Sequence, residues 1–256
     1  MNKTICLIAT FHDPEGERSI KFLKKYISSI KEIFDFVKIG IPTTTSLIIF
    51  DCLKEGRIDF FKTPPGFGSR TRRLVLKEGL KENADYYLSI DLDRLLYWLE
   101  KYPVELKEII NKIKNLSLNV FLSIGRTKKA WNSHPKYQKI PELKTNQAVS
   151  KELGFTVDIT DGCYAFPRKI AQLIDKMAQG SKSGVSDIEW LMIAKVYANS
   201  KIKTFFVDGL GWETNLIFGN KRAVNPQGVY TITRKQLAEE TIGMIDKVKK
   251  RHACLN

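Results

Sequence analysis

The sequence lacks any apolar run long enough to cross a bilayer, which argues against a membrane-spanning helix. It also lacks an internal repeat, a low-complexity tract and a clear linker, which favours a single domain over a repeat architecture. The opening apolar stretch Ile5–Ala9 is too short for the core of a signal peptide and has no cleavage-like ending. We therefore expect this stretch to be the first strand of a cytoplasmic protein.

Cysteine and histidine are both scarce, with four and three residues in 256. No two cysteines have the spacing of metal ligands, which argues against a structural zinc site and a disulfide framework. We expect free thiols at all four positions: Cys6, Cys52, Cys163 and Cys254.

Acidic residues are outnumbered by basic ones, 28 to 42, which leaves a formal net charge of +14. Such an excess attracts polyanions, including nucleic acid, anionic lipid and phosphorylated substrates. A lysine-rich solvated surface explains the same number equally well. No recognised nucleic-acid motif accompanies the charge, so specific nucleic-acid binding is not expected.

Apolar, β-branched runs alternate with segments of helical periodicity. This alternation predicts an α/β fold: one three-layer domain over residues 1–256, built around a mostly parallel sheet. Expected strands are Thr4–Thr10, Phe36–Ile41, Asp59–Lys62, Tyr86–Ile90, Leu118–Ile124 and Lys203–Asp208. Expected helices are Arg18–Ile33, Arg70–Glu82, Arg94–Tyr102, Val104–Lys114, Lys144–Leu153, Arg168–Ala178 and Asp187–Ala198, with a last helix capped by Thr233. Leu47–Leu53 fits strand or helix, and the proline-containing Lys128–Lys144 predicts a long loop or lid.

Two acids, Asp91 and Asp93, directly follow the expected strand Tyr86–Ile90. An apolar strand can be buried in a parallel sheet, but carboxylates cannot follow it without partners, so both acids should lie at the carboxyl edge. Open α/β sheets bind ligands at that edge. Two carboxylates separated by one residue can share a hard divalent cation, which in turn holds phosphates. A plainer reading is that the acids cap the following helix near Arg94.

A turn with two prolines and two glycines, at residues 64–68, comes shortly before the acidic pair and opens the helix Arg70–Glu82. Glycines let the backbone approach a ligand, and a helix N-terminus with Arg70, Arg72 and Arg73 favours anions. The alternative is a basic helix face in water.

The order of basic helix, apolar strand and Asp-x-Asp resembles the family-2-like glycosyltransferases with the GT-A fold. The resemblance implies transfer of a sugar from a nucleotide-sugar donor, with Mn²⁺ or Mg²⁺ held by Asp91 and Asp93. It implies that the strand end Thr10, Phe11 and His12 faces the nucleotide. It also implies that Gly68, Arg70, Arg73 and Asp91 contact the donor. Arg73 stands where the family pattern has asparagine.

The resemblance extends to the second half of the chain at two places. Asp161 and Gly162 look like the acceptor-side loop, although a tight turn explains them as well. The segment Ser186–Trp190 matches the family's acidic pair at Asp187, which implies a base that deprotonates the acceptor in an inverting transfer. Glu189 is included as catalytic and Trp190 as acceptor-binding; an N-cap role explains Asp187 equally well. His134 is the best histidine candidate for a further metal ligand.

The same reading divides the chain into a nucleotide-sugar-binding half (1–125), an acceptor-binding half with the lid (126–230) and a C-terminal helix (231–256). The acceptor is an unidentified sugar, lipid or small molecule. The basic helix Thr233–Arg251 permits peripheral contact with an anionic membrane at its inner face. A related nucleotidyltransferase is the alternative enzyme, but a glycine- and lysine-rich loop is missing after Ala9. A non-catalytic basic nucleic-acid- or anion-binding protein is the alternative outside enzymes.

Overall fold

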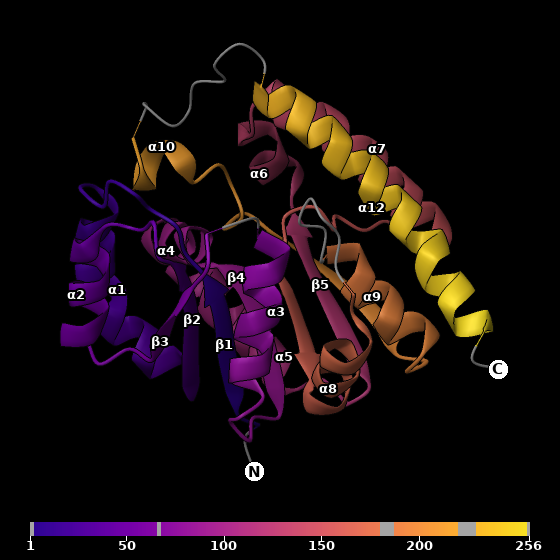
Figure 1. Cartoon of the computed structure of the whole chain (residues 1–256), viewed down its shortest axis with the longest axis horizontal. Coiled ribbons are helices and arrows are strands. Elements are labelled where there is room, and N and C mark those ends of the chain that lie inside the picture. The colour runs from indigo at the N-terminus through magenta and orange to yellow at the C-terminus, as the bar shows by residue number, and fades with distance from the viewer. Residues whose placement is uncertain (1–2, 66–67, 180–186, 220–228, 255–256) are drawn as a thin grey trace.

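The structure is a computed structural model that describes residues 3–65, 68–179, 187–219 and 229–254 (Figure 1). Seven strands form one sheet in the order β3-β2-β1-β4-β6-β5-β7. All neighbouring strands are parallel except for β6, which runs antiparallel to both β4 and β5. The predicted α/β class with a mostly parallel sheet is confirmed.

The elements follow one another as strand and helix through the first half and become irregular later. The strands are β1 Ile5–Thr10, β2 Phe36–Pro42, β3 Phe60–Thr63, β4 Tyr86–Asp91, β5 Val120–Arg126, β6 Tyr164–Pro167 and β7 Lys201–Val207. The helices are α1 Ser19–Ile33, α2 Leu47–Glu55, α3 Gly68–Gly79, α4 Leu92–Lys101, α5 Pro103–Lys114, α6 Lys128–Ser133, α7 Lys136–Leu153, α8 Arg168–Met177, α9 Asp187–Val196, α10 Thr214–Ile217 and α12 Val229–Ala253.

Helices cover both faces of the sheet, as Figure 1 shows, and give two hydrophobic cores. Alternate residues of β1 point to opposite faces, because side chains of a strand alternate with period two. Leu7 belongs to the core under α1, α2, α4 and α5, while Ile8 belongs to the core under α3, α8, α9 and α12. The buried strands are therefore apolar throughout, which leaves polar residues to their ends.

The predicted strands and most predicted helices are confirmed to within a few residues, and the ambiguous Leu47–Leu53 is helix α2. The predicted loop or lid at Lys128–Lys144 is wrong, because this segment forms α6 and the first half of α7. Pro135 precedes the first turn of α7, where a missing N–H costs nothing, and Pro141 is tolerated inside the helix. The predicted cap at Thr233 is also wrong, since α12 begins four residues earlier at Val229.

Among the described residues, no helix is both long and apolar enough to cross a membrane.

Candidate functional site

The carboxyl ends of β1 and β4 lie side by side and bring Thr10 next to Asp91. The Thr10 hydroxyl donates a hydrogen bond of 2.7 Å to Asp91 Oδ1. Both residues are the last of their strands, so the hydroxyl and the carboxylate emerge from the sheet together. The expectation that the first acid lies at the carboxyl edge is confirmed.

Arg72 of α3 neutralises Asp91. Its Nη2 donates to both carboxylate oxygens, at 2.9 and 2.8 Å. Burial alone would raise the pKa of Asp91, but the charges of Arg72 and Arg94 and the hydrogen bonds from Arg72 and Thr10 lower it below its usual value. Asp91 is therefore an ionised carboxylate, oriented by the three hydrogen bonds from Thr10 and Arg72.

Gly162 makes room for the Arg72 guanidinium. A Cβ at this position would lie 2.8 Å from Arg72 Nη2, closer than real contacts allow. The backbone of Gly162 is also left-handed, with φ +76°, a conformation that side-chain-bearing residues rarely adopt. The predicted acceptor-side turn thus meets the predicted donor helix at Asp91.

Asp93 is repelled by two acids, Glu213 and Asp91, and this repulsion together with burial outweighs the attraction of Arg94. Burial, then the negative charges of Glu213 and Asp91, raise the pKa of Asp93 to about 8. Glu213 follows β7 and is 6% exposed; within the described chain its buried Oε2 has no hydrogen-bond partner. Asp93 and Glu213 repel each other, and Glu213 Oε2 has no hydrogen-bond partner among the described residues. A cation bound between them would therefore be stabilised.

Arg94 lies between the acids of this edge. Burial opposes its charge, but attraction to Glu213, Asp91 and Asp161 outweighs burial and raises its pKa. Asp161 accepts a 3.1 Å hydrogen bond from the Cys163 N–H, and burial followed by repulsion from Asp158 raises its pKa well above the usual value. Arg94 Nη1 and Asp161 Oδ2 are buried without partners among the described residues. Buried polar atoms are normally paired, so these atoms are candidates for ligand contacts.

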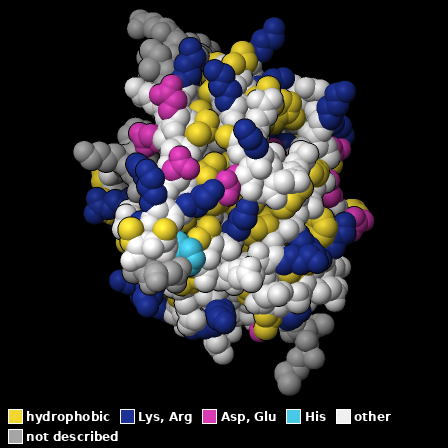
Figure 2. All heavy atoms as spheres, turned by 90° about the vertical axis from the view of Figure 1, so that its right-hand side faces the viewer, with side chains coloured by type: hydrophobic (Ala, Val, Ile, Leu, Met, Phe, Trp, Pro, Cys, Tyr) yellow, Lys and Arg dark blue, Asp and Glu magenta, His cyan; other side chains and the backbone are white. Residues whose placement is uncertain are grey.

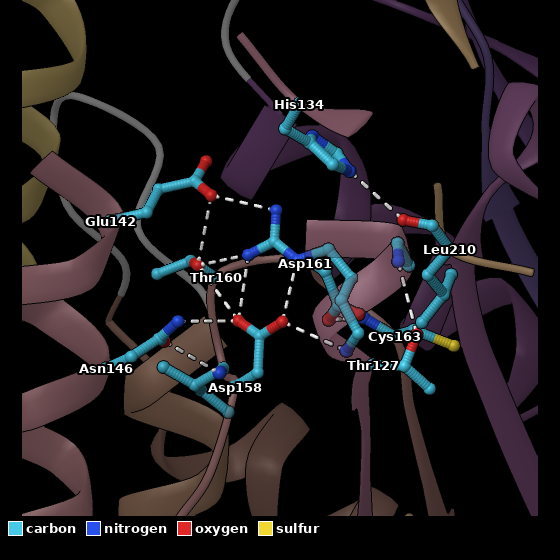
Figure 3. A network of polar contacts seen from close by, with 12 residues as sticks. Thr127, His134, Glu142, Asn146, Asp158, Thr160, Asp161, Cys163 and Leu210 are labelled. Atoms are coloured by element: carbon cyan, nitrogen blue, oxygen red, sulfur yellow. Dashed lines mark hydrogen bonds and ion pairs between the residues drawn. The ribbon is translucent and has the colours of Figure 1, made fainter. Parts of the chain in front are cut away.

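A charged network around Arg126 lies near Asp161 (Figure 3). Arg126 ends β5, and its Nε and Nη2 donate to the two oxygens of Asp158 at 2.7 and 2.8 Å. Glu142 of α7 lies 2.9 Å from Nη1, and the Trp131 ring lies 4.5 Å from the guanidinium carbon. Asn146 adds a hydrogen bond of 2.6 Å to Asp158. All four polar residues of this network are buried: Arg126, Glu142, Asn146 and Asp158. The network therefore attaches α7 to the end of β5.

His134 lies at the end of α6 beside this network (Figure 3). Its Nε2 is 3.1 Å from the Leu210 carbonyl, which can only accept, so Nε2 carries the proton and Nδ1 has the lone pair. Burial, then repulsion from Arg126, lowers the His134 pKa to about 3. Nδ1 is buried without a partner among the described residues. His134 is therefore a neutral acceptor near Arg94.

Several predicted donor contacts lie away from Asp91. Arg73 donates to the Gln179 carbonyl, and Arg70 is exposed. Phe11 is 3% exposed and stacks on Phe218, and His12 contacts the Thr44 hydroxyl at 2.9 Å. Gly68 opens α3.

The predicted helix supplies Arg72 instead of its neighbours. The sequence shows that this helix is basic but not which arginine faces the sheet edge, because one residue rotates a side chain by about 100°. Arg94 could be noticed in the sequence because it follows Asp91 by three residues. No motif in the sequence marked Glu213 or Arg126 as a site residue.

The predicted catalytic segment is divided. Glu189 is fully buried, and its Oε1 accepts from Arg251 and from the Gln179 N–H, both at 2.9 Å. Trp190 is also fully buried and meets Phe166 edge-on. The structure therefore corrects both predictions: Glu189 joins α9 to α12 and to the segment after α8, and Trp190 packs on β6 inside the core. Asp187 begins α9, but its side chain lies outside the described part.

The described residues contain no group of three or more His, Cys, Asp or Glu side chains arranged to hold a metal. The donor set nearest to such a site is the pair Asp93 and Glu213, with Asp91 adjacent but bound to Arg72. Oxygen ligands of this kind suit Mg²⁺ and Mn²⁺. Glu213 Oε2, which has no hydrogen-bond partner among the described residues, is an oxygen of the kind that such a cation would bind.

Comparison of the sequence with protein-family models and with curated proteins finds no match. Solved structures do match. Glucosyl-3-phosphoglycerate synthase from Mycobacterium tuberculosis in complex with UDP is 14% identical, with 94% of this chain and 80% of that chain covered and a TM-score of 0.59. The same synthase with Mn²⁺, UDP-glucose and phosphoglyceric acid is 14% identical over the same shares, with a TM-score of 0.61. A further mycobacterial protein is 14% identical, covers 82% and 66%, and has a TM-score of 0.57.

At this identity the likeness concerns the architecture alone. The chain has the GT-A fold.

Proposed function

We propose that this protein transfers a sugar from a nucleoside-diphosphate sugar to an acceptor hydroxyl, with help from a divalent cation. The observation that carries the proposal is the crowded acidic pair Asp93 and Glu213, beside an Asp91 that Arg72 has already neutralised. The fold supports it, since similar structures are glycosyltransferases bound to UDP and Mn²⁺. UDP is accordingly the first nucleotide to test.

Asp93 and Glu213 would hold Mn²⁺ or Mg²⁺, and this ion would neutralise charge that develops on the departing diphosphate. Asp91 keeps its orientation through Thr10 and Arg72 and is available to accept from a ribose hydroxyl. Arg72 places positive charge at the same edge, where it offsets the negative charge of the donor.

The acceptor side of the proposal uses Asp161 and Arg94, whose unpartnered atoms match the acceptors and donors that a hydroxyl-rich group requires. The acceptor of the similar synthase is phosphoglyceric acid. The guanidinium of Arg94 could pair with a carboxylate or phosphate on the acceptor of this protein. Asp187 is proposed as the base: it takes the hydroxyl proton while the acceptor oxygen bonds to the anomeric carbon and the carbon–diphosphate bond breaks. This single displacement inverts the anomeric centre.

Thermal unfolding with nucleotides tests the proposal. UDP, GDP, CDP, ADP and TDP-sugars are each added with Mn²⁺ or with EDTA, because a ligand of the folded state must raise the melting temperature. One nucleotide should give a metal-dependent shift that is lost in Asp93→Asn and Glu213→Gln. Asp246→Asn is the matched control, since Asp246 is an exposed acid on α12. Shifts that persist in EDTA, or in both site variants, would contradict the cation site.

Product analysis separates the remaining alternatives. Incubation with the stabilising nucleotide sugar should release nucleoside diphosphate, whereas a nucleotidyltransferase would consume a nucleoside triphosphate and release pyrophosphate. The anomeric configuration of the product, read by proton NMR, tests inversion. Retention of configuration would remove Asp187 from the role of base and leave the cation site intact.

A further inference from the structure

The first part of helix α7 buries polar side chains and exposes aliphatic ones, the reverse of most helices on a protein surface. Its buried side carries Gln138, Glu142 and Asn146, each less than 9% exposed. Its outer side carries Ile140, which is 60% exposed, and Leu143, which is 48% exposed. Surface helices usually bury their apolar residues and expose their polar ones, so this first part of α7 requires a physical explanation.

The buried polar residues Glu142 and Asn146 belong to the charged network around Arg126. Glu142 pairs with Arg126 and Asn146 donates to Asp158, so both hold α7 in place (Figure 3). The outward residues Ile140 and Leu143 contribute nothing to that attachment. They leave apolar surface in water, which contact with an apolar partner would remove.

Positive charge surrounds the exposed aliphatic residues. The segment 128–151 contains six lysines and a single acid, Glu142, which is buried against Arg126. The lysines are Lys128, Lys129, Lys136, Lys139, Lys144 and Lys151. Lys136, Ile140, Leu143, Lys144 and Lys151 are all exposed and follow helical spacing along one side of α7. Figure 2 views the side of the molecule that carries α7 and α12, and it shows Lys and Arg side chains interspersed with hydrophobic ones and with fewer Asp and Glu side chains.

We propose that the outer side of α7 rests on an anionic phospholipid bilayer. Aliphatic side chains on a helix enter the headgroup region when lysines around them meet negative lipid charge. This inference is independent of the proposed sugar transfer, because it uses the opposite side of α7 from the charged network around Arg126. It would place the site one helix away from the bilayer surface.

The surface differs from the C-terminal helix that the sequence indicated for such contact. In α12, Met244, Ile245 and Val248 are buried against the domain. Exposed acids, Glu239 and Asp246, alternate with its lysines, and Lys249 pairs with Glu152 at 3.2 Å. The exposed residues of α12 are therefore of mixed charge, whereas those of α7 from Lys136 to Lys151 include lysines and no acid; Glu152, the acid near the end of α7, pairs with Lys249, and Lys129 of α6 pairs with Asp208.

Co-sedimentation with vesicles tests the proposal on the full chain. The probes are phosphatidylcholine vesicles with and without phosphatidylglycerol, at low and at high salt. The protein should sediment only with the anionic vesicles at low salt, because the attraction is screened by salt. Each lysine near the surface is worth about fivefold in partitioning, so Lys136→Gln with Lys144→Gln should weaken binding by about twentyfold.

The aliphatic residues are tested separately. Ile140→Gln with Leu143→Gln should weaken binding by about tenfold or more while leaving thermal stability unchanged, because both side chains are exposed. Matched controls are Lys247→Gln with Lys250→Gln on α12, and Val104→Gln, since Val104 is 69% exposed on α5. The controls should bind vesicles like the unaltered protein.

Three outcomes would overturn the proposal. One is equal binding of the α7 variants and the unaltered protein, or loss of binding only in the α12 control. Another is tighter association with an RNA or DNA homopolymer that depends on the lysines but not on Ile140 and Leu143, which would indicate nucleic acid. The third is a protomer that sediments as a dimer in the absence of lipid and becomes monomeric in Ile140→Gln with Leu143→Gln.

Discussion

Substitution of Gly162 by alanine tests the contact between the acceptor-side turn and Arg72. Gly162 and Gly154 both have left-handed backbones, with φ +76° and φ +80°. Alanine should cost about 1–2 kcal/mol at either position for the backbone conformation alone. A Cβ at Gly154 meets nothing within 4 Å, whereas at Gly162 it would lie 2.8 Å from Arg72 Nη2. Gly154→Ala is therefore a matched control for the backbone effect.

The difference between the two variants measures the displaced Arg72. Arg72 and Asp91 have side chains only 14% and 24% exposed, and hydrogen bonds to charged groups contribute about 1.5–3 kcal/mol. The guanidinium can move and keep part of this contact, so we expect Gly162→Ala to cost about 1–2 kcal/mol more than Gly154→Ala. Urea unfolding at neutral pH measures both free energies of unfolding.

Arg72→Ala completes the experiment by removing the group that the new methyl would displace. In this background the two glycine substitutions should have equal costs, within about 0.5 kcal/mol. If Gly162→Ala costs no more than Gly154→Ala in the native sequence, the close approach of Arg72 to Gly162 is refuted. An excess that survives in Arg72→Ala would show that the strain has another source.

Three further predictions concern charges in and near the site. Because the pKa of Asp93 is raised from 3.8 to about 8, the folded state binds a proton more tightly than the unfolded chain, so the free energy of unfolding in EDTA should fall as pH rises from about 4 to about 8. A tenfold difference in proton affinity between the folded and unfolded states is worth about 1.4 kcal/mol. Urea unfolding at pH 5 and pH 8 should show a smaller dependence of the free energy of unfolding on pH in Asp93→Asn. An unchanged dependence would contradict the raised pKa. Glu189→Gln should cost about 2 kcal/mol of stability by leaving Arg251 without its counter-charge. Nucleotide affinity, measured by calorimetry, should be preserved. Loss of affinity without loss of stability would return Glu189 to the site. The His134 ring should stay neutral with its proton on Nε2 from pH 5 to pH 8 in nitrogen-15 NMR, and a titration in this range would refute its burial.

The sequence by itself determined the layered α/β architecture and the edge on which the site lies. Buried parallel strands must be apolar along their whole length, so Ile5–Thr10 and Tyr86–Asp91 were visible as runs, and the acids that follow them had to emerge at the carboxyl ends. Asp91 and Thr10 could be placed on the same edge, because parallel strands end at one edge of a sheet, but only the strand order made β1 and β4 neighbours. These are local properties, set by composition and period.

Only the tertiary structure decided which charged groups meet there. Arg72 rather than Arg70 or Arg73 reaches Asp91, because the rotation of α3 is set by how Val75 and Leu76 pack into the core. Glu213 reaches Asp93 from more than a hundred residues away, and Arg126 holds Glu142 and Asp158 from two other segments. The same network keeps α7 helical where its prolines predicted a loop. Such pairings depend on burial and on long-range contacts, which no window of the sequence contains.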